Sequence, residues 1–162
     1  MDSEVEAILR SGEGRFLSVE EARRVLAIAK TYEQRLSVCV ALEGKEETIA
    51  RKVTELTMAK FPKFRERHLA DEKSIRDISL ILRYIAHSIL RNDPEFLREK
   101  LLFWMQGVFA SKGFGQTTRA AYEFLRSVVT EELPPPAAIE VNRFVDICIE
   151  SCARYQDAVG AS

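Results

Sequence analysis

The chain has 162 residues, of which 46% are hydrophobic and 30% are charged, as expected for one globular domain with a sizeable core. Its 24 basic and 25 acidic side chains nearly cancel, so the composition indicates neither a nucleic-acid partner nor an anionic membrane surface. The 3 cysteines are an odd number without a framework spacing, which is typical of reduced thiols.

The sequence also gives no support for a membrane protein or for an enzyme. No apolar run is long enough to span a bilayer, and the acidic start M-D-S-E-V-E lacks a basic and apolar signal segment. We therefore expect a cytoplasmic protein with no transmembrane segment. Neither a nucleophile–base set, nor a glycine-rich phosphate loop, nor a metal-ligand spacing is present, which argues against an enzyme or a metal site.

Helical periodicity runs through nearly the whole chain, and no segment alternates like a strand. We therefore predict an all-α fold in a single domain, residues 1–162. A short helix over 3–10 is followed by glycines, and Ser18 with Glu21 forms a capping box that begins a long helix up to Gly44. The buried stripe of this long helix is predicted to be Ala22, Val25, Leu26, Ala29, Tyr32, Leu36, Cys39 and Val40.

The remaining elements follow in order. Helices are predicted over 46–60, 74–91, 96–109, 116–130 and 138–155. Pro62 ends the first of these, and a charged connection, 63–73, leads to the next. Asn92-Asp93-Pro94 forms a turn, and Pro134-Pro135-Pro136 forms a stiff break without amide donors. Cys39, Cys148 and Cys152 are expected to pack in the core.

The segment 74–91 carries two distinct faces. Ile75, Ile78, Leu82, Ile85 and Ile89 recur at steps of three and four residues, which predicts a buried apolar stripe. Arg76, Leu80, Arg83 and His87 recur in the same way on another face, with Asp77 beside them. Two arginines and a carboxylate next to aliphatic residues indicate either a site for an acidic, flat, largely apolar ligand or an ordinary solvated face.

The strings Ser74-Ile75-Arg76-Asp77, Leu82-Arg83-Tyr84 and Asn92-Asp93-Pro94 resemble the central helix of the phycobiliproteins, most of all of allophycocyanin subunits. That helix has a C-x-R-D motif, an L-R pair and a G-D-P-like turn, and the resemblance spans nearly the whole chain. It implies a globin-like (phycocyanin-like) helical fold with an N-terminal helical hairpin extension. It also implies self-association, or association with a phycobiliprotein-like partner, through the N-terminal helices.

The resemblance further implies a site for a linear tetrapyrrole (a bilin), such as biliverdin or phycocyanobilin. Asp77 would accept hydrogen bonds from the pyrrole nitrogens, and Arg76 and Arg83 would pair with the propionates. Ser74 stands where the family has its attachment cysteine, and His87 stands where it has a pocket tyrosine. A serine hydroxyl does not add to a vinyl group as a thiolate does, so the bilin would be held noncovalently.

Three functions remain open from the sequence. The first is an allophycocyanin-like bilin-binding protein with a light-harvesting or pigment-related role. The second is a ligand-free interaction or assembly module, in which Trp104, Leu80 and Ile81 would fill the former pocket. The third is a haem-binding globin with His87 as the iron ligand. His68, in the charged connection, is expected to be solvated.

Overall fold

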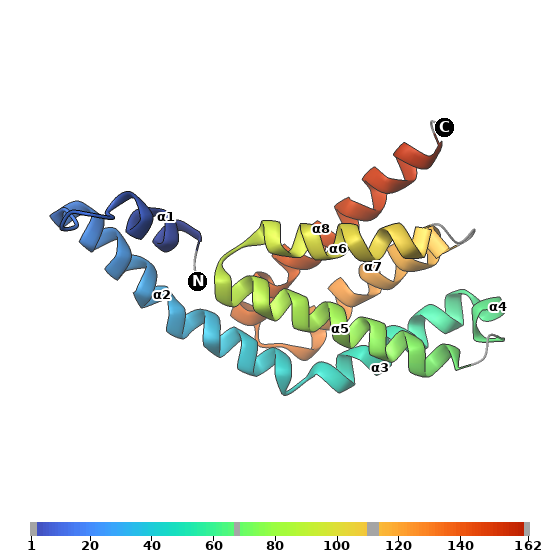
Figure 1. The fold of residues 1–162 in the computed structure, drawn as a ribbon. Coiled ribbons are helices and arrows are strands. Elements are labelled where there is room, and N and C mark those ends of the chain that lie inside the picture. Colours follow the sequence, from blue (N-terminus) through green and yellow to red (C-terminus); the bar gives the residue numbers. More distant parts are fainter. Residues whose placement is uncertain (1–2, 67–68, 110–113, 161–162) are drawn as a thin grey trace.

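The computed structural model describes the backbone of residues 3–66, 69–109 and 114–160 and the side chains of residues 4–66, 69–101 and 116–152. Over these ranges the regular structure is helical and contains no strand, which confirms the predicted all-α class (Figure 1). The helices are α1 (Ser3–Ser11), α2 (Val19–Glu43), α3 (Glu46–Lys60), α4 (Pro62–Arg65), α5 (Ala70–Arg91), α6 (Pro94–Phe109), α7 (Phe114–Glu132) and α8 (Pro135–Gly160).

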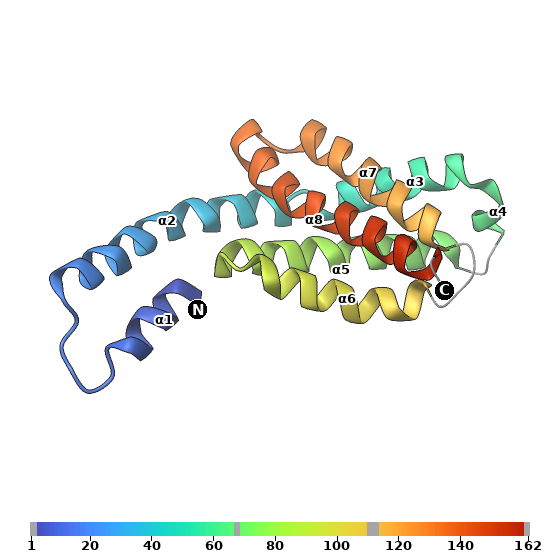
Figure 2. The same cartoon turned by 90° about the horizontal axis from the view of Figure 1, so that it is seen from above.

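Helix α5 is the centre of the bundle. It contacts α2, α3, α4, α6 and α8, and Figures 1 and 2 show it running between α3 and α6. Ile85 and Ile89 are fully buried at 0% exposure, and Ile78 and Leu82 are buried beside them, whereas Ile75 is only partly buried. The predicted apolar stripe of this helix is therefore confirmed.

Helices α7 and α8 form a closely packed pair that covers α3 and α6. The stripe predicted for the last helix is confirmed, since its members are all at 0% exposure: Val141, Phe144, Val145, Cys148 and Cys152. The helix begins at Pro135, earlier than predicted, because proline at a first helical position needs no amide donor and is preset to helical φ.

The N-terminal arm, defined as α1 together with residues 19–34 of α2, extends away from the bundle (Figures 1 and 2). The turn inside the arm has Gly14 at φ 84°, a left-handed conformation that favours glycine. The predicted capping box is present: the Ser18 hydroxyl accepts from the Glu21 amide at 3.2 Å, and the Glu21 carboxylate accepts from the Ser18 amide at 2.7 Å. Local sequence signals therefore set both ends of the turn.

The buried stripe predicted for the long helix is wrong for most of its members. Leu26, Leu36 and Val40 are 57%, 44% and 59% exposed, and Tyr32 is 50% exposed. Cys39 is buried as predicted, and the other buried residues of α2 are Arg35 and Leu42, all three in its second half. The apolar period of the first half of α2 does not reflect contact with the core, because this half lies outside the bundle with α1 beside it (Figures 1 and 2).

The charged connection predicted over 63–73 is also wrong in part. Pro62 begins the one-turn helix α4, and α5 begins at Ala70 with Leu69 as its N-cap. Asp71 and Glu72 lie in the first turn of α5, where the helix dipole favours acidic side chains. The central helix is therefore one turn longer than predicted. Ser74, Arg76 and Asp77 consequently lie inside the helix and not in its first turn.

Arg35 joins the arm to the bundle. Its side chain is 8% exposed, and its Nη1 donates to the carbonyl oxygen of Leu90, near the C-terminal end of α5, at 2.8 Å. Nη2 lies 3.5 Å from the carbonyl of Ile28, and the guanidinium lies 5.6 Å from the Tyr32 ring centroid. A buried cation thus connects two turns of α2 to the end of the central helix, whose terminal carbonyls attract positive charge.

We predict that Arg35→Leu destabilises the chain and loosens the arm. The Leu90 carbonyl would lose a charged donor, and such hydrogen bonds contribute about 1.5–3 kcal/mol. The expected result is a lower melting temperature with faster amide exchange over 19–35. Arg23→Leu is the control, because Arg23 is 74% exposed and only weakly paired with Glu20 at 3.9 Å. Equal effects of the two substitutions would contradict the anchoring role.

Candidate functional site

Ser74 lies on the inner side of α5, against α3. Its Oγ accepts a hydrogen bond from Thr54 Oγ1 at 3.1 Å, and Thr54 is buried at 3% exposure. Because α5 begins at Ala70 with Leu69 as its N-cap, Ser74 lies inside the helix and not at its start. The hydroxyl at the position of the family cysteine is therefore part of the α3–α5 packing.

Asp77 lies at the edge of the exposed face and is held by its neighbour Arg76. Arg76 donates to Oδ1 from Nη2 at 3.1 Å and from Nε at 3.3 Å, and the two side chains are 73% and 37% exposed. No donor among the described residues reaches Oδ2. One oxygen of a half-buried carboxylate is thus free to accept hydrogen bonds from a ligand.

Arg83 is held by a carboxylate at the start of α3. Its Nη2 and Nε donate to the two carboxylate oxygens of Glu46 at 2.8 and 3.1 Å, in a bidentate pair that joins α5 to the first turn of α3. This pairing, led by the hydrogen bond with Glu46, raises the pKa of Arg83. At about 100° per residue, Arg83 and Asp77 lie about 120° apart around the helix axis.

The charge of the Asp77 carboxylate also acts on a buried phenol. Tyr122, on α7, is 1% exposed, and its hydroxyl has no hydrogen-bond partner in the described part of the chain. Burial, then the nearby Cys148, Cys152 and Asp77, raises the pKa of Tyr122 well above its ordinary value. An unpaired buried hydroxyl is costly, so it marks a place where a further hydrogen-bonding group is needed.

The three thiols are buried, as predicted. Burial raises the pKa of Cys39 to about 11 and that of Cys152 to about 12, and it raises the pKa of Cys148 further still. Cys39 and Cys148 Sγ also contact the carbonyls of Ala86 and Phe144 at 3.4 and 3.5 Å. Native thiols of this kind are poor nucleophiles, because the thiolate is the reacting form.

The remaining predicted residues fall into exposed and buried groups. His87 and Leu80 lie on the exposed face with Arg76 and Arg83, as the period predicted, whereas Ile81 is 2% exposed and belongs to the core. The side chain of Trp104 and the whole of His68 lie outside the described residues. The structure therefore places Arg76, Arg83 and His87 on one surface, with Asp77 at its edge and Ser74 inside.

Three residues at this site were not found by the sequence analysis. Thr54 and Glu46 are joined to α5 only by the fold, and no local pattern indicated their pairing. Tyr122 had a usable signal, since it lies in the helical register of the buried Leu125 and Val129. A phenol in an otherwise apolar stripe needs a partner for its hydroxyl.

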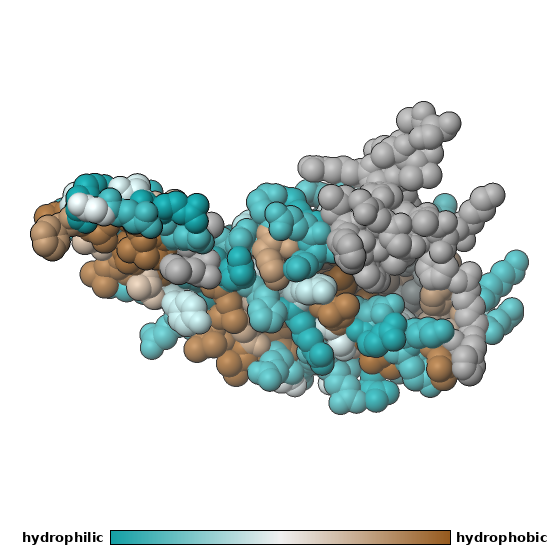
Figure 3. Space-filling model, in the orientation of Figure 1, coloured by the Kyte–Doolittle hydropathy of each residue, from teal (hydrophilic) through white to brown (hydrophobic). Residues whose placement is uncertain are grey.

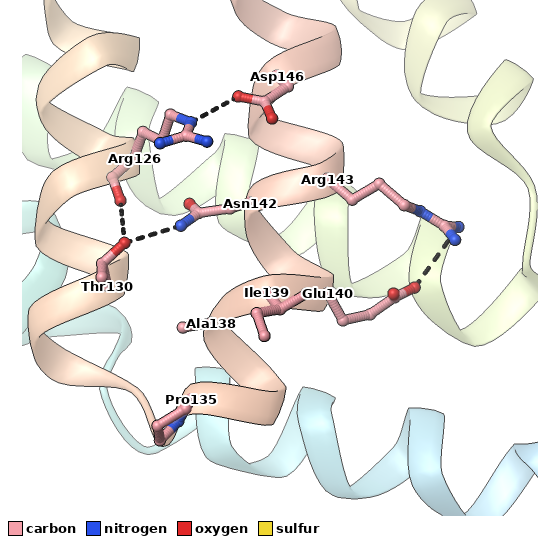
Figure 4. Close-up of a pocket in the computed structure, with 9 residues that line it drawn as sticks. All are labelled: Arg126, Thr130, Pro135, Ala138, Ile139, Glu140, Asn142, Arg143 and Asp146. Carbon is pink, nitrogen blue, oxygen red and sulfur yellow. Dashed lines mark hydrogen bonds and ion pairs between the residues drawn. The ribbon is translucent and has the colours of Figure 1, made fainter.

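A hollow lies between α7 and α8, and none of these residues lines it (Figure 4). It has a volume of about 510 Å³, and its polar side chains pair with one another. Arg126 Nε donates to Asp146 at 2.7 Å, and Asn142 Nδ2 donates to the Thr130 hydroxyl at 2.9 Å. None of the residues of the α5 site lines it, so it is a separate surface feature.

The described structure defines a class of all-helical protein: a bundle with a protruding arm and a central helix that presents arginines and a carboxylate. No group of three or more His, Cys, Asp or Glu within the described ranges could hold a metal ion. Among the described helices, none has the length and apolar character needed to cross a membrane.

Comparison with known families identifies the chain more closely. A family model described as phycobilisome protein matches residues 11–152, so the chain belongs to this family. Its members have a globin-like all-α fold, carry linear tetrapyrroles, assemble with one another and are structural pigment carriers, not enzymes. Comparison with the sequences of curated proteins gives no match.

We predict that the native protein resists thiol reagents at pH 8. Each thiol is buried and keeps its proton, so labelling with a maleimide should be slow until denaturant is added, when three thiols should react. The melting temperature should fall as the pH rises above about 8.5, where unfolded thiols release protons that native thiols retain. Ser74→Cys is the control and should add one half-buried, faster-reacting thiol. Rapid native labelling without Ser74→Cys would contradict this assignment.

Proposed function

We propose that the chain is an allophycocyanin-like pigment protein that holds a linear tetrapyrrole noncovalently beside α5. Two observations support this proposal: Asp77 Oδ2 receives no donor from the described residues while Arg76 holds Oδ1, and the buried Tyr122 hydroxyl has no hydrogen-bond partner among them. A bilin offers pyrrole N–H donors and carbonyl acceptors on one flat apolar frame. It therefore suits this combination of groups.

Asp77 would be the central acceptor. A carboxylate can accept from two or more N–H groups at once, whereas a neutral amide offers one oxygen. Arg76 already orients Asp77 through Oδ1, so the free oxygen needs little reordering before it binds. Arg76 and Arg83, about 10 Å apart along the axis, would lie toward the ligand's propionates, although Arg83 is already paired with Glu46.

Noncovalent attachment follows from the state of the nucleophiles. Ser74 has a hydroxyl engaged by Thr54, and the three cysteines are buried with raised pKa values. A thioether needs a reactive thiolate near the pigment, and no described side chain supplies one. The pigment would therefore leave the chain when it unfolds.

We predict that Asp77→Asn weakens binding of biliverdin or phycocyanobilin by about tenfold or more, because charged acceptors contribute about 1.5–3 kcal/mol per contact. Absorbance titration measures the affinity, and the visible band should shift. Asp71→Asn is the matched control: it also removes a carboxylate from α5, one that contacts Arg65 at 3.6 Å. Acidic urea should release all pigment, whereas Ser74→Cys should allow covalent retention.

A ligand-free assembly module is the second candidate function. It is favoured by the observation that both arginines are already neutralised within the chain, Arg76 by Asp77 and Arg83 by Glu46. The same titration separates the two candidates. Absence of binding by every bilin tested, and by haem as the third alternative, would support the module and overturn the pigment proposal.

We also propose that α2 is the surface that pairs the chain with a second copy or with a related subunit. Small and apolar residues recur along it at alternating steps of three and four, interrupted only by Glu33, as in a helix-pairing seam. These residues are Val19, Ala22, Leu26, Ala29, Leu36 and Val40, and all are exposed. Figure 3 shows hydrophobic side chains gathered along the arm. Such a continuous apolar surface is typical of an interface.

We predict that Leu36→Glu weakens self-association by about tenfold or more, because it places a charge in the middle of the seam. Sedimentation over a range of concentrations measures this. Gln34→Glu is the matched control, since it introduces the same charge on the same helix but on another face. A strictly monomeric unsubstituted chain at high concentration would contradict self-pairing.

A further inference from the structure

The Glu46–Arg83 pair has an unequal environment. The Glu46 side chain is 21% exposed, whereas that of Arg83 is 65% exposed. Glu46 is the first residue of α3, where free backbone amides and the helix dipole favour a negative charge. The carboxylate is thus the fixed member of the pair, and the long arginine side chain is the member that reaches toward it.

This pairing holds the guanidinium against the first residue of α3. Asp77 lies about 120° from Arg83 around the axis of α5. A ligand carboxylate that uses Arg83 must therefore displace Glu46 or share the guanidinium with it.

We propose that Glu46 is a specificity-determining residue that competes with the ligand's carboxylates for Arg83. With Glu46 in place, the site gains little from a propionate group and discriminates weakly between an acidic tetrapyrrole and its neutral ester. This inference rests on the proposed pigment function and adds a residue that acts through Arg83, without touching the pigment itself.

The structure offers a close control. Glu47 is the next residue of the same turn, and it pairs with Arg51 within α3 at 2.8 Å. No hydrogen bond or ion pair among the described residues joins Glu47 to Arg83, so Glu47→Gln removes the same charge from the first turn of α3 without freeing that guanidinium. An effect of Glu46→Gln that Glu47→Gln lacks and that Arg83→Leu abolishes therefore acts through Arg83.

The experiment compares the affinities of biliverdin and biliverdin dimethyl ester by absorbance titration. Glu46→Gln should strengthen binding of the diacid by about threefold to fivefold, the range of one exposed ion pair, and leave the ester unchanged. The gain should shrink in high salt, and it should vanish when Arg83→Leu is added. Glu47→Gln should not change the preference for the diacid over the ester. Glu46→Asp, one methylene shorter, should give a smaller gain and serves if the Gln variant folds poorly.

The outcomes separate this inference from the function on which it rests. Pigment binding with equal effects of Glu46→Gln on the diacid and the ester, or with no effect on either, overturns the role of Glu46 and leaves the pigment site intact. Absence of binding of both compounds by the unsubstituted chain and by Glu46→Gln overturns both proposals together.

Discussion

The burial of one side of α5 is the constraint on which the rest of the structure depends. Ile81, Leu82, Ile85 and Ile89 are at most 2% exposed, so the rotation of this helix about its own axis is determined by the core. Once that rotation is set, the helical period decides where every polar residue lies. Ser74 must face α3, Asp77 must lie at a boundary, and the arginines must face outward.

The polar residues around α5 are satisfied largely within the chain, and this shapes what the site can do. Each arginine of the exposed face has a carboxylate partner, one on its own helix and one on α3. Exposed pairs contribute little to folding stability, so these contacts can be exchanged for those of a ligand at small cost. The groups without a donor or partner among the described residues, Oδ2 of Asp77 and the hydroxyl of Tyr122, are correspondingly the more informative ones about binding.

The sequence predicted the fold well where periodicity and burial have the same cause. The stripes of α5 and α8, the capping box at Ser18 and the buried thiols all follow from local patterns. The sequence analysis failed along α2, where the apolar period belongs to an exposed surface and not to the core. It also failed near Ala70, where acidic residues that were expected in a connection form the first turn of α5. At the site, Asp77 and Arg83 were predictable from one helix, whereas Thr54 and Glu46 come from α3, and their pairings depend on the tertiary fold.

The attachment of α2 through Arg35 has a mechanical consequence. From Arg35 to Val19 the helix runs sixteen residues, a rigid lever of about 24 Å at about 1.5 Å per residue. A tilt of about five degrees at Arg35 displaces the far end of this segment, near Val19, by about 2 Å. Such a tilt would strain the hydrogen bond from Arg35 to the Leu90 carbonyl, which lies on the same helix as Asp77. If another subunit docks on the tip as proposed, α2 would connect it directly to the helix beside which the pigment would lie.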